Sequence, residues 1–303
     1  MNELDAAGIT DPALRASYAE CKRLNSLHGK TYYLATLLLP SAKRPFVHAL
    51  YGFARYADEI VDDLSSTLTP QEKADVLRTW SSGVLSDLSA GKSNDAVGAA
   101  LVDTVSRFNI PHQHFVDFLH SMEMDLTVST YATYEALSEY VYGSAAVIGL
   151  EMVPILGVLS DEAYESAKKL GIAFQLANFI RDVGEDLDRG RIYLPLDELA
   201  AHGVDEKMLY ARVLTPEIIQ ALKFQIARVR QLQAEAAPGI DLLHATSRPC
   251  IRAASELYCG IVDEVEAIGY DIFNKRAKTS TARRLRVAGK AYIQALSARR
   301  ALE

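Results

Sequence analysis

Two groups of acidic side chains have the spacing to bind a metal ion. Asp58 and Asp62 are four residues apart, and Asn178, Asp182 and Asp186 form a ladder at the same spacing. On a helix, side chains four residues apart project from one face. Like charges at this spacing destabilise a helix by a few tenths of a kcal/mol. Burying them unpaired costs much more, so a cation is expected to offset the repulsion.

Magnesium is the cation expected at these groups, with manganese as the alternative. Magnesium is usually held by one or two carboxylates together with the phosphates of a substrate. Arg55 and Arg181 lie beside the two acidic groups and could contact such a phosphate. One such pair of acids alone is more often a solvated helix face. Two of them on mostly apolar segments favour a site for metal and diphosphate.

Both acidic groups are expected on helices. Apolar residues recur at i, i+3 and i+4 ahead of each group, at Phe46, Val47, Leu50, Tyr51, Phe53, Ala54, Ala57, Ile60 and Val61, and at Leu170, Ala173, Phe174, Ala177, Ile180 and Val183. This period is typical of amphipathic helices, and alternating strand patterns are almost absent. Helix starts are expected at Thr69, Ser160 and Thr215. The pattern predicts an all-α fold of about ten helices in one domain spanning 1–303.

Bulk composition limits the partners and the compartment. The net charge of −7 and the pI near 5.6 argue against nucleic-acid binding. Three scattered cysteines are too few for a disulfide framework, so a reducing cytoplasm is expected. The acidic N-terminus lacks the apolar run of a signal peptide. The apolar stretch from Val147 to Leu159 is interrupted by Glu151, and it is expected to be too short to span a bilayer.

The C-terminal region has the opposite charge. From Asp271 onward there are nine Lys or Arg residues and two acids. One interpretation is a solvated basic helix. The other is a patch that makes weak peripheral contact with anionic lipid, at the inner face of the membrane, or that touches a diphosphate.

Longer motifs resemble the squalene/phytoene synthase family, and within it the bacterial phytoene synthases of actinobacterial type. The resemblance runs from about His28 to Arg276. It rests on HGKTYY (28–33), HALYGFARYADEIVDD (48–63), EYVYGSAAVIG (139–149), FQLANFIRDVGEDLDRGRIYLP (174–195) and GYDIF (269–273). The resemblance implies a single-domain isoprenoid synthase helical bundle with a central active-site cavity.

The resemblance also implies roles for individual residues. Asp58, Asp62, Asn178, Asp182 and Asp186 would hold magnesium and the diphosphate of a prenyl substrate. Tyr51 and Tyr140 match aromatic residues near the reacting carbons. Further positions match residues that line the site or bind diphosphate, namely His28, Lys30, Thr31, Tyr32, Arg55, Gln175, Arg181, Arg191, Tyr193, Tyr258, and Lys275 or Arg276.

The implied reaction is the head-to-head condensation of two geranylgeranyl diphosphates to phytoene, through a cyclopropyl diphosphate, in carotenoid biosynthesis. The sequence has no dinucleotide-binding signature, so no NADPH is expected. One alternative is a related enzyme that prenylates another acceptor, such as an aromatic secondary metabolite, or that uses farnesyl diphosphate. Another is a non-catalytic helical assembly factor, which should have lost the acidic ligands that this chain keeps. Prenyl chain length, acceptor and oligomeric state stay open.

The small residues from Gly143 to Ala146 have two interpretations that we weight equally. They could leave room for a long prenyl chain beside their helix. They could instead allow two helices to pack closely, since a glycine inside a helix usually has a packing reason.

Overall fold

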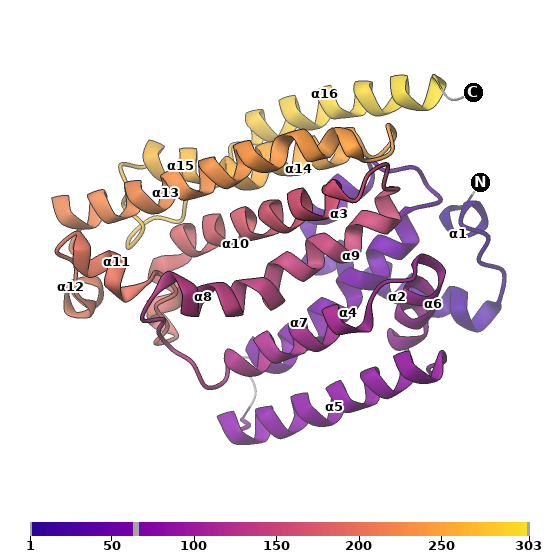
Figure 1. Ribbon diagram of the computed structural model, residues 1–303, viewed down its shortest axis with the longest axis horizontal. Helices are drawn as coiled ribbons and strands as arrows, with labels where there is room; N and C mark the ends of the chain where they lie inside the picture. Colours follow the sequence, from indigo (N-terminus) through magenta and orange to yellow (C-terminus); the bar gives the residue numbers. More distant parts are fainter. Residues whose placement is uncertain (1, 63–66, 302–303) are drawn as a thin grey trace.

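Figure 1 shows the protein as a computed structural model that describes residues 2–62 and 67–301. In these ranges the chain forms helices and two isolated β-bridges, and no β-strand. The α-helices in chain order are α1 (Glu3–Ala6), α2 (Pro12–His28), α3 (Lys30–Thr36), α4 (Arg44–Asp62), α5 (Pro70–Ala90), α6 (Gly98–Phe108), α7 (His112–Met124), α8 (Tyr134–Val141), α9 (Val147–Leu156), α10 (Glu162–Asp188), α11 (Leu196–Ala201), α12 (Glu206–Ala211), α13 (Pro216–Ala236), α14 (Arg248–Cys259), α15 (Ile261–Ala267) and α16 (Thr281–Arg300). A π-helical turn, η1 (Tyr142–Ala146), and a 3-10 turn, η2 (Ala237–Leu242), complete them.

The all-α prediction is confirmed, but the expected number of about ten helices is too low for the described residues. Helices α1, α3, α11, α12 and α15 have four to seven residues each. Elements this short do not display a 3.6-residue period in a window of about 11 residues. The sequence therefore revealed the long helices and missed the short ones.

Two of the three expected helix starts are capped by the predicted threonines, whereas α10 begins after Asp161, next to the expected Ser160, without a side-chain cap. Thr69 and Glu72 form the capping box of α5: the Thr69 hydroxyl accepts from the Glu72 amide, and the Glu72 carboxylate accepts from the Thr69 amide at 2.8 Å. Thr215 caps α13 by accepting from the Ile218 amide at 3.4 Å. These bonds use amides that have no partner inside the helix, which fixes where each helix begins.

Helix α10 runs through the middle of the bundle, between α8 and α9 on one side and α13 and α14 on the other (Figure 1). Most of its buried residues, such as Ala177 and Ile180, belong to one hydrophobic cluster. The buried residues of α4, such as Leu50 and Phe53, belong to a second cluster that also includes α2, α6 and α7. The two acidic groups are therefore carried by the central helix of each cluster.

Helices α8, η1 and α9 form one continuous helix, Tyr134–Leu156. By length and composition alone this 23-residue helix could cross a membrane, so the apolar stretch is part of a longer element than the sequence predicted. However, 56% of its most apolar window is buried inside the protein, where it packs against α7 and α10. The burial identifies it as an interior helix of the bundle.

Candidate active site

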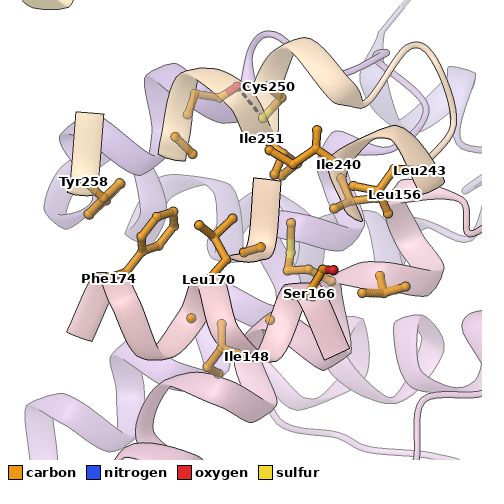
Figure 2. A pocket seen from close by; sticks show the side chains of 18 of the residues that line it. Ile148, Leu156, Ser166, Leu170, Phe174, Ile240, Leu243, Cys250, Ile251 and Tyr258 are labelled. Carbon is orange, nitrogen blue, oxygen red and sulfur yellow. Dashed lines mark hydrogen bonds between the residues drawn. The ribbon is translucent and has the colours of Figure 1, made fainter. Parts of the chain in front are cut away.

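An apolar cavity of about 260 Å³ lies where the two hydrophobic clusters meet. Its walls come from α3, η1, α9, α10, η2 and α14. Figure 2 shows Ile148, Leu170, Ile240 and Leu243 around this space, between α10 and the segments that lie over it. Small residues of α10, such as Ala167, line the cavity, where larger side chains would fill the space. The cavity has the shape and the lining to hold an aliphatic chain away from water.

The small-residue run of η1 contributes to close helix packing and also to the wall of the cavity. A Cβ atom at Gly143 would lie 2.1 Å from the carbonyl oxygen of Asp117 on α7, so glycine is needed for close helix packing. Ser144 and Ala145, in contrast, line the cavity. Consecutive side chains of a helix point in different directions, so neighbouring residues of η1 can serve packing and cavity lining.

Aromatic rings and one amide gather at one end of the cavity lining. Phe174 and Tyr258 stack with ring centroids 4.9 Å apart, and Figure 2 shows the pair side by side. Tyr32 stacks on Tyr51 at 5.5 Å and donates a hydrogen bond to a methionine sulfur at 3.5 Å. Gln175, which follows Phe174 on α10, also lines the cavity. The predicted residues Tyr32, Gln175 and Tyr258 are thus brought together.

The first acidic group lies at the end of α4. The carboxylate of Asp58 is half exposed and lies 3.9 Å from the Arg55 guanidinium. Arg55 donates to Glu59 at 3.1 Å, and His28 Nε2 lies 3.6 Å from the same Glu59 oxygen. Sequence reasoning did not assign Glu59, although it lies inside the acidic motif. The predicted residue Asp62 is the last residue of α4, but its side chain lies outside the described atoms.

For two further predicted residues, the structure describes only the backbone. Lys30 and Thr31 begin α3, immediately after Gly29, and their side chains lie outside the described atoms. Asp63, the last residue of the first acidic motif, lies outside the described residues altogether.

The second acidic group lies on α10 and is paired with arginines. Arg181 Nε donates to Asp182 at 2.8 Å, and Arg276 Nη2 lies 3.1 Å from the same oxygen. Arg276 also contacts Glu185 at 3.1 Å. Lys275 instead lies 3.5 Å from Asp271, with most of its side chain exposed. Of the two basic residues that the sequence offered, Arg276 reaches the acidic group.

The ladder on α10 is electrostatically suited to a cation. Burial, and then the charge of Asp182, raise the pKa of Asp186 to about 7. The side-chain oxygen of Asn178 is buried without a hydrogen-bond partner. A hard cation would stabilise the Asp186 carboxylate and use the free oxygen of Asn178. No three His, Cys, Asp or Glu side chains of the described residues converge in a metal-binding arrangement, and Asp182 is held by its two arginines.

A third group of residues surrounds Asp125, just after α7. Tyr140 donates to Asp125 Oδ2 at 2.8 Å, and Tyr193 donates to Oδ1 at 2.9 Å. Arg191 donates to the Asp125 carbonyl at 2.8 Å, and Tyr193 stacks on Phe179 with centroids 4.2 Å apart. Burial, and then the charge of Asp125, raise the pKa of Tyr140 well above its usual value, so Tyr140 remains a donor.

The sequence predicted Tyr140, Arg191 and Tyr193 but missed Asp125. The only local signal was a carboxylate at the end of the apolar helix α7, and no spacing linked it to the other three. A parallel β-bridge between Thr130 and Ile192 brings the two loops together. The contact therefore depends on tertiary structure.

Comparison with known families matches residues 26–283 to squalene/phytoene synthase. A chloroplastic phytoene synthase of Narcissus pseudonarcissus is 39% identical over 290 residues, which cover 93% of this chain and 67% of that protein. Phytoene synthase 2 of Solanum lycopersicum, also chloroplastic, is 38% identical over 290 residues, which cover 93% of this chain and 92% of that protein.

A solved structure also matches. The crystal structure of a dehydrosqualene synthase in complex with ligand aligns with a TM-score of 0.84 at 28% identity, covering 94% of this chain and 98% of that one. The matching family residues, the shared helical fold and the cavity beside two acidic helices lead to one assignment. The chain belongs to the squalene/phytoene synthase family and is a prenyltransferase of isoprenoid biosynthesis.

Proposed function

We propose that this enzyme joins two molecules of geranylgeranyl diphosphate head to head and produces phytoene for carotenoid biosynthesis. The observation that carries the proposal is an apolar cavity whose walls include α10, the helix that also bears Asn178, Asp182 and Asp186. The relatives named phytoene synthase, at 38–39% identity over most of the chain, support it. The whole chain is proposed to act as one catalytic domain.

The acidic residues form the proposed metal site. The proposed ligands are Asp58 and Asp62 from α4 and Asn178, Asp182 and Asp186 from α10. Magnesium is the metal proposed, with manganese as the alternative. When bound, the metal supplies the positive charge that a leaving diphosphate needs. The orphaned oxygen of Asn178 and the raised pKa of Asp186 support this assignment.

Basic side chains orient the diphosphate in this proposal. Arg55, Arg181 and Arg276 already lie at the acidic residues, so they can exchange carboxylates for phosphate oxygens as substrate binds. Arginine suits this role because its planar guanidinium can make two parallel hydrogen bonds to an oxyanion. Arg191, His28, Lys30 and Thr31 complete the set that the family resemblance suggests.

The rest of the proposed mechanism depends on a dry cavity. Loss of diphosphate leaves an allylic cation that would react with water, and the apolar walls exclude it. Its allylic carbon would alkylate the double bond of the second substrate, and loss of a proton from that carbon would close the ring to give a cyclopropyl diphosphate. A second ionisation, rearrangement and proton loss would give phytoene. The family resemblance implies that the rings of Tyr51 and Tyr140 stabilise the cations through their faces. Tyr51 stacks on the cavity-lining Tyr32, whereas Tyr140 lies outside the lining, against Phe179 and Tyr193.

Incubation with geranylgeranyl diphosphate and magnesium, without NADPH, tests the proposal by product mass analysis. Phytoene is the expected product. Turnover of farnesyl diphosphate alone would contradict the chain length, and turnover that requires an added aromatic acceptor would contradict the head-to-head reaction. We further propose a cytoplasmic location with weak peripheral contact to the inner face of the membrane. The three cysteines, all free and buried, are consistent with a reducing compartment.

A further inference from the structure

Helix α16 contacts the rest of the protein through one narrow face. Val287, Ala291 and Ala295 are buried at intervals of four residues, and they pack toward α14. Figure 1 shows α16 along α14 at the outer edge of the bundle. The opposite face of α16 is therefore presented to the surroundings.

That outer face carries large apolar side chains. Leu285 is 69% exposed, Ile293 is 66% exposed and Tyr292 is 56% exposed. Leu285 and Ile293 are the two most exposed large apolar residues of the described chain. Positions 285, 292 and 293 lie on one side of a helix, and the exposed small residues at 288 and 289 continue the stripe between them. A stripe of this kind is typical of a surface that binds something apolar.

The stripe is bordered by positive charge. Arg284, Arg286 and Lys290 are exposed beside it, and none of the three contacts a carboxylate of the described residues. Arg283, on the inner side of the same helix, instead pairs with Asp263 at 2.9 Å and with another acid of α15. No acidic residue occurs between positions 271 and 303. Arg284, Arg286 and Lys290 thus lack the acidic partners that Arg283 has among the described residues.

Charge complementarity selects the occupant of this face. An anionic bilayer offers negative headgroups to the cations and an apolar interior to the stripe. A second copy of the chain in a two-fold dimer would place the same patch against itself, so that Arg284, Arg286 and Lys290 would face their own like charges. An anionic lipid surface fits both features of the face.

We propose that α16 docks the enzyme on an anionic membrane surface. Leu285, Tyr292 and Ile293 enter the interface between headgroups and acyl chains. Arg284, Arg286 and Lys290 contact the headgroups.

The position of α16 explains why docking would help the enzyme, and this explanation rests on the proposed function. Helix α14 lines the cavity with Cys250, Ile251, Ala254 and Tyr258 and packs against α16. Arg299, near the end of α16, donates to the Leu38 carbonyl at 2.8 Å, just beyond the cavity-lining helix α3. The cavity is therefore one helix away from the docked face. A hydrocarbon product without polar groups has to leave for a lipid phase, and docking through α16 brings that phase close.

Cosedimentation of the full chain with vesicles, in the absence of substrate, tests the docking. Vesicles of phosphatidylglycerol and phosphatidylcholine are compared with vesicles of phosphatidylcholine alone. Wild type should bind the anionic vesicles in a salt-sensitive way. Replacing one of Arg284, Arg286 and Lys290 by Gln should weaken binding about fivefold, because each cation near such a surface contributes about 1 kcal/mol. Ile293→Glu should weaken it roughly tenfold or more. The matched control is Leu159→Glu, since Leu159 is 62% exposed on another part of the surface.

Insertion is tested separately from adsorption. Tyr292→Trp should shift its fluorescence to the blue on addition of anionic vesicles and be quenched by brominated acyl chains. The control is Tyr210→Trp on α12, where the tyrosine is 47% exposed, and it should not respond. An unchanged Tyr292→Trp spectrum would overturn the proposed insertion.

Activity in detergent distinguishes this proposal from the proposed function. The α16 variants should keep wild-type turnover there, which shows that they fold. Wild-type binding of Ile293→Glu and of the Gln variants to vesicles would refute the docking, whatever the reaction proves to be. A dimer in light scattering that the α16 variants dissociate, with vesicle binding unchanged, would assign the face to a second copy instead. Vesicle binding without turnover of geranylgeranyl diphosphate would leave the docking supported and contradict only the reaction.

Discussion

Asp125 accepts a hydrogen bond from the hydroxyl of Tyr140 through one carboxylate oxygen, and from Tyr193 through the other. Both tyrosine rings are buried, so the carboxylate fixes two phenols that come from separate parts of the chain. Asp125 therefore positions Tyr140, which the family resemblance connects with the reacting carbons, and Tyr193, which it connects with the lining of the site or with diphosphate.

We predict that Asp125→Ala lowers turnover by at least tenfold, because two buried phenols lose their acceptor, at about 1–3 kcal/mol each. Asp125→Asn, which keeps one acceptor oxygen, should have a smaller effect. The measurement is kcat together with the melting temperature. In a double-mutant cycle, Asp125→Ala and Tyr140→Phe should be non-additive because both remove the hydrogen bond between these two side chains. Strict additivity would show that Asp125 acts independently of Tyr140.

Removal of an acidic side chain should stop the reaction while leaving the fold intact. Asp58→Ala and Asp182→Ala are each expected to abolish detectable turnover, because each removes a carboxylate spaced for metal binding. The melting temperature of Asp58→Ala should stay near that of the wild type, because this carboxylate is half exposed. That of Asp182→Ala should fall slightly, because the loss of the ion pairs with Arg181 and Arg276 outweighs the relief of repulsion with Asp186. Asp188→Ala is the matched control: it is an exposed acid on α10 that pairs with Arg212, and its loss should leave turnover close to normal. Near-normal activity of either site variant would refute the assignment.

Magnesium and diphosphate should stabilise the protein synergistically. Magnesium alone would find incomplete coordination, and a prenyl thiodiphosphate alone would be repelled by the acids. Together they complete each other's coordination. A ligand at 100 times its dissociation constant stabilises the native state by about 2.7 kcal/mol, which raises the melting temperature of a chain this size by several degrees. Thermal melts with each component and with both test this. Purely additive shifts, or equal synergy in an Asp58→Ala, Asp182→Ala double variant, would speak against a shared site.

The carboxyl of Glu151 should destabilise the protein at neutral pH. Glu151 is fully buried on α9, and neither carboxyl oxygen has a hydrogen-bond partner. Burial raises its pKa well above the usual value, so the native state keeps a proton that the unfolded state loses above about pH 4.3. Stability therefore falls as pH rises through this window. Glu151→Leu should raise the free energy of unfolding by about 1–3 kcal/mol near pH 7, and by less at pH 5.

Denaturant unfolding at pH 5 and pH 7 measures this difference. Glu151→Gln serves as the control of shape, because it removes the titration but keeps a buried polar group. It should lose the pH dependence without gaining the full stability of the leucine variant. A gain for Glu151→Leu that does not change between the two pH values would show that the carboxyl does not titrate as expected.

The sequence by itself determined the long helices and the residues that they carry. The 3.6-residue period and the i, i+4 spacing are local properties, so α4 with Asp58 and α10 with Asn178, Asp182 and Asp186 could be predicted from the chain alone. Caps such as Thr69 are also local, because a side chain bonds an amide three residues away. The role of Asp62 remains a prediction of the same kind, and the roles of Lys30 and Thr31 remain predictions from the family resemblance.

Only the tertiary structure decided which distant segments meet. It selected Arg276 over Lys275 for the contact with Asp182, because the loop after α15 brings the arginine to α10. It joined Asp125 to Tyr140 and Tyr193, although no sequence interval relates them. It also divided one run of small residues between helix packing and cavity wall. Such contacts depend on how helices pack and where loops return, and the energy of these long-range contacts is not encoded in any short stretch of sequence.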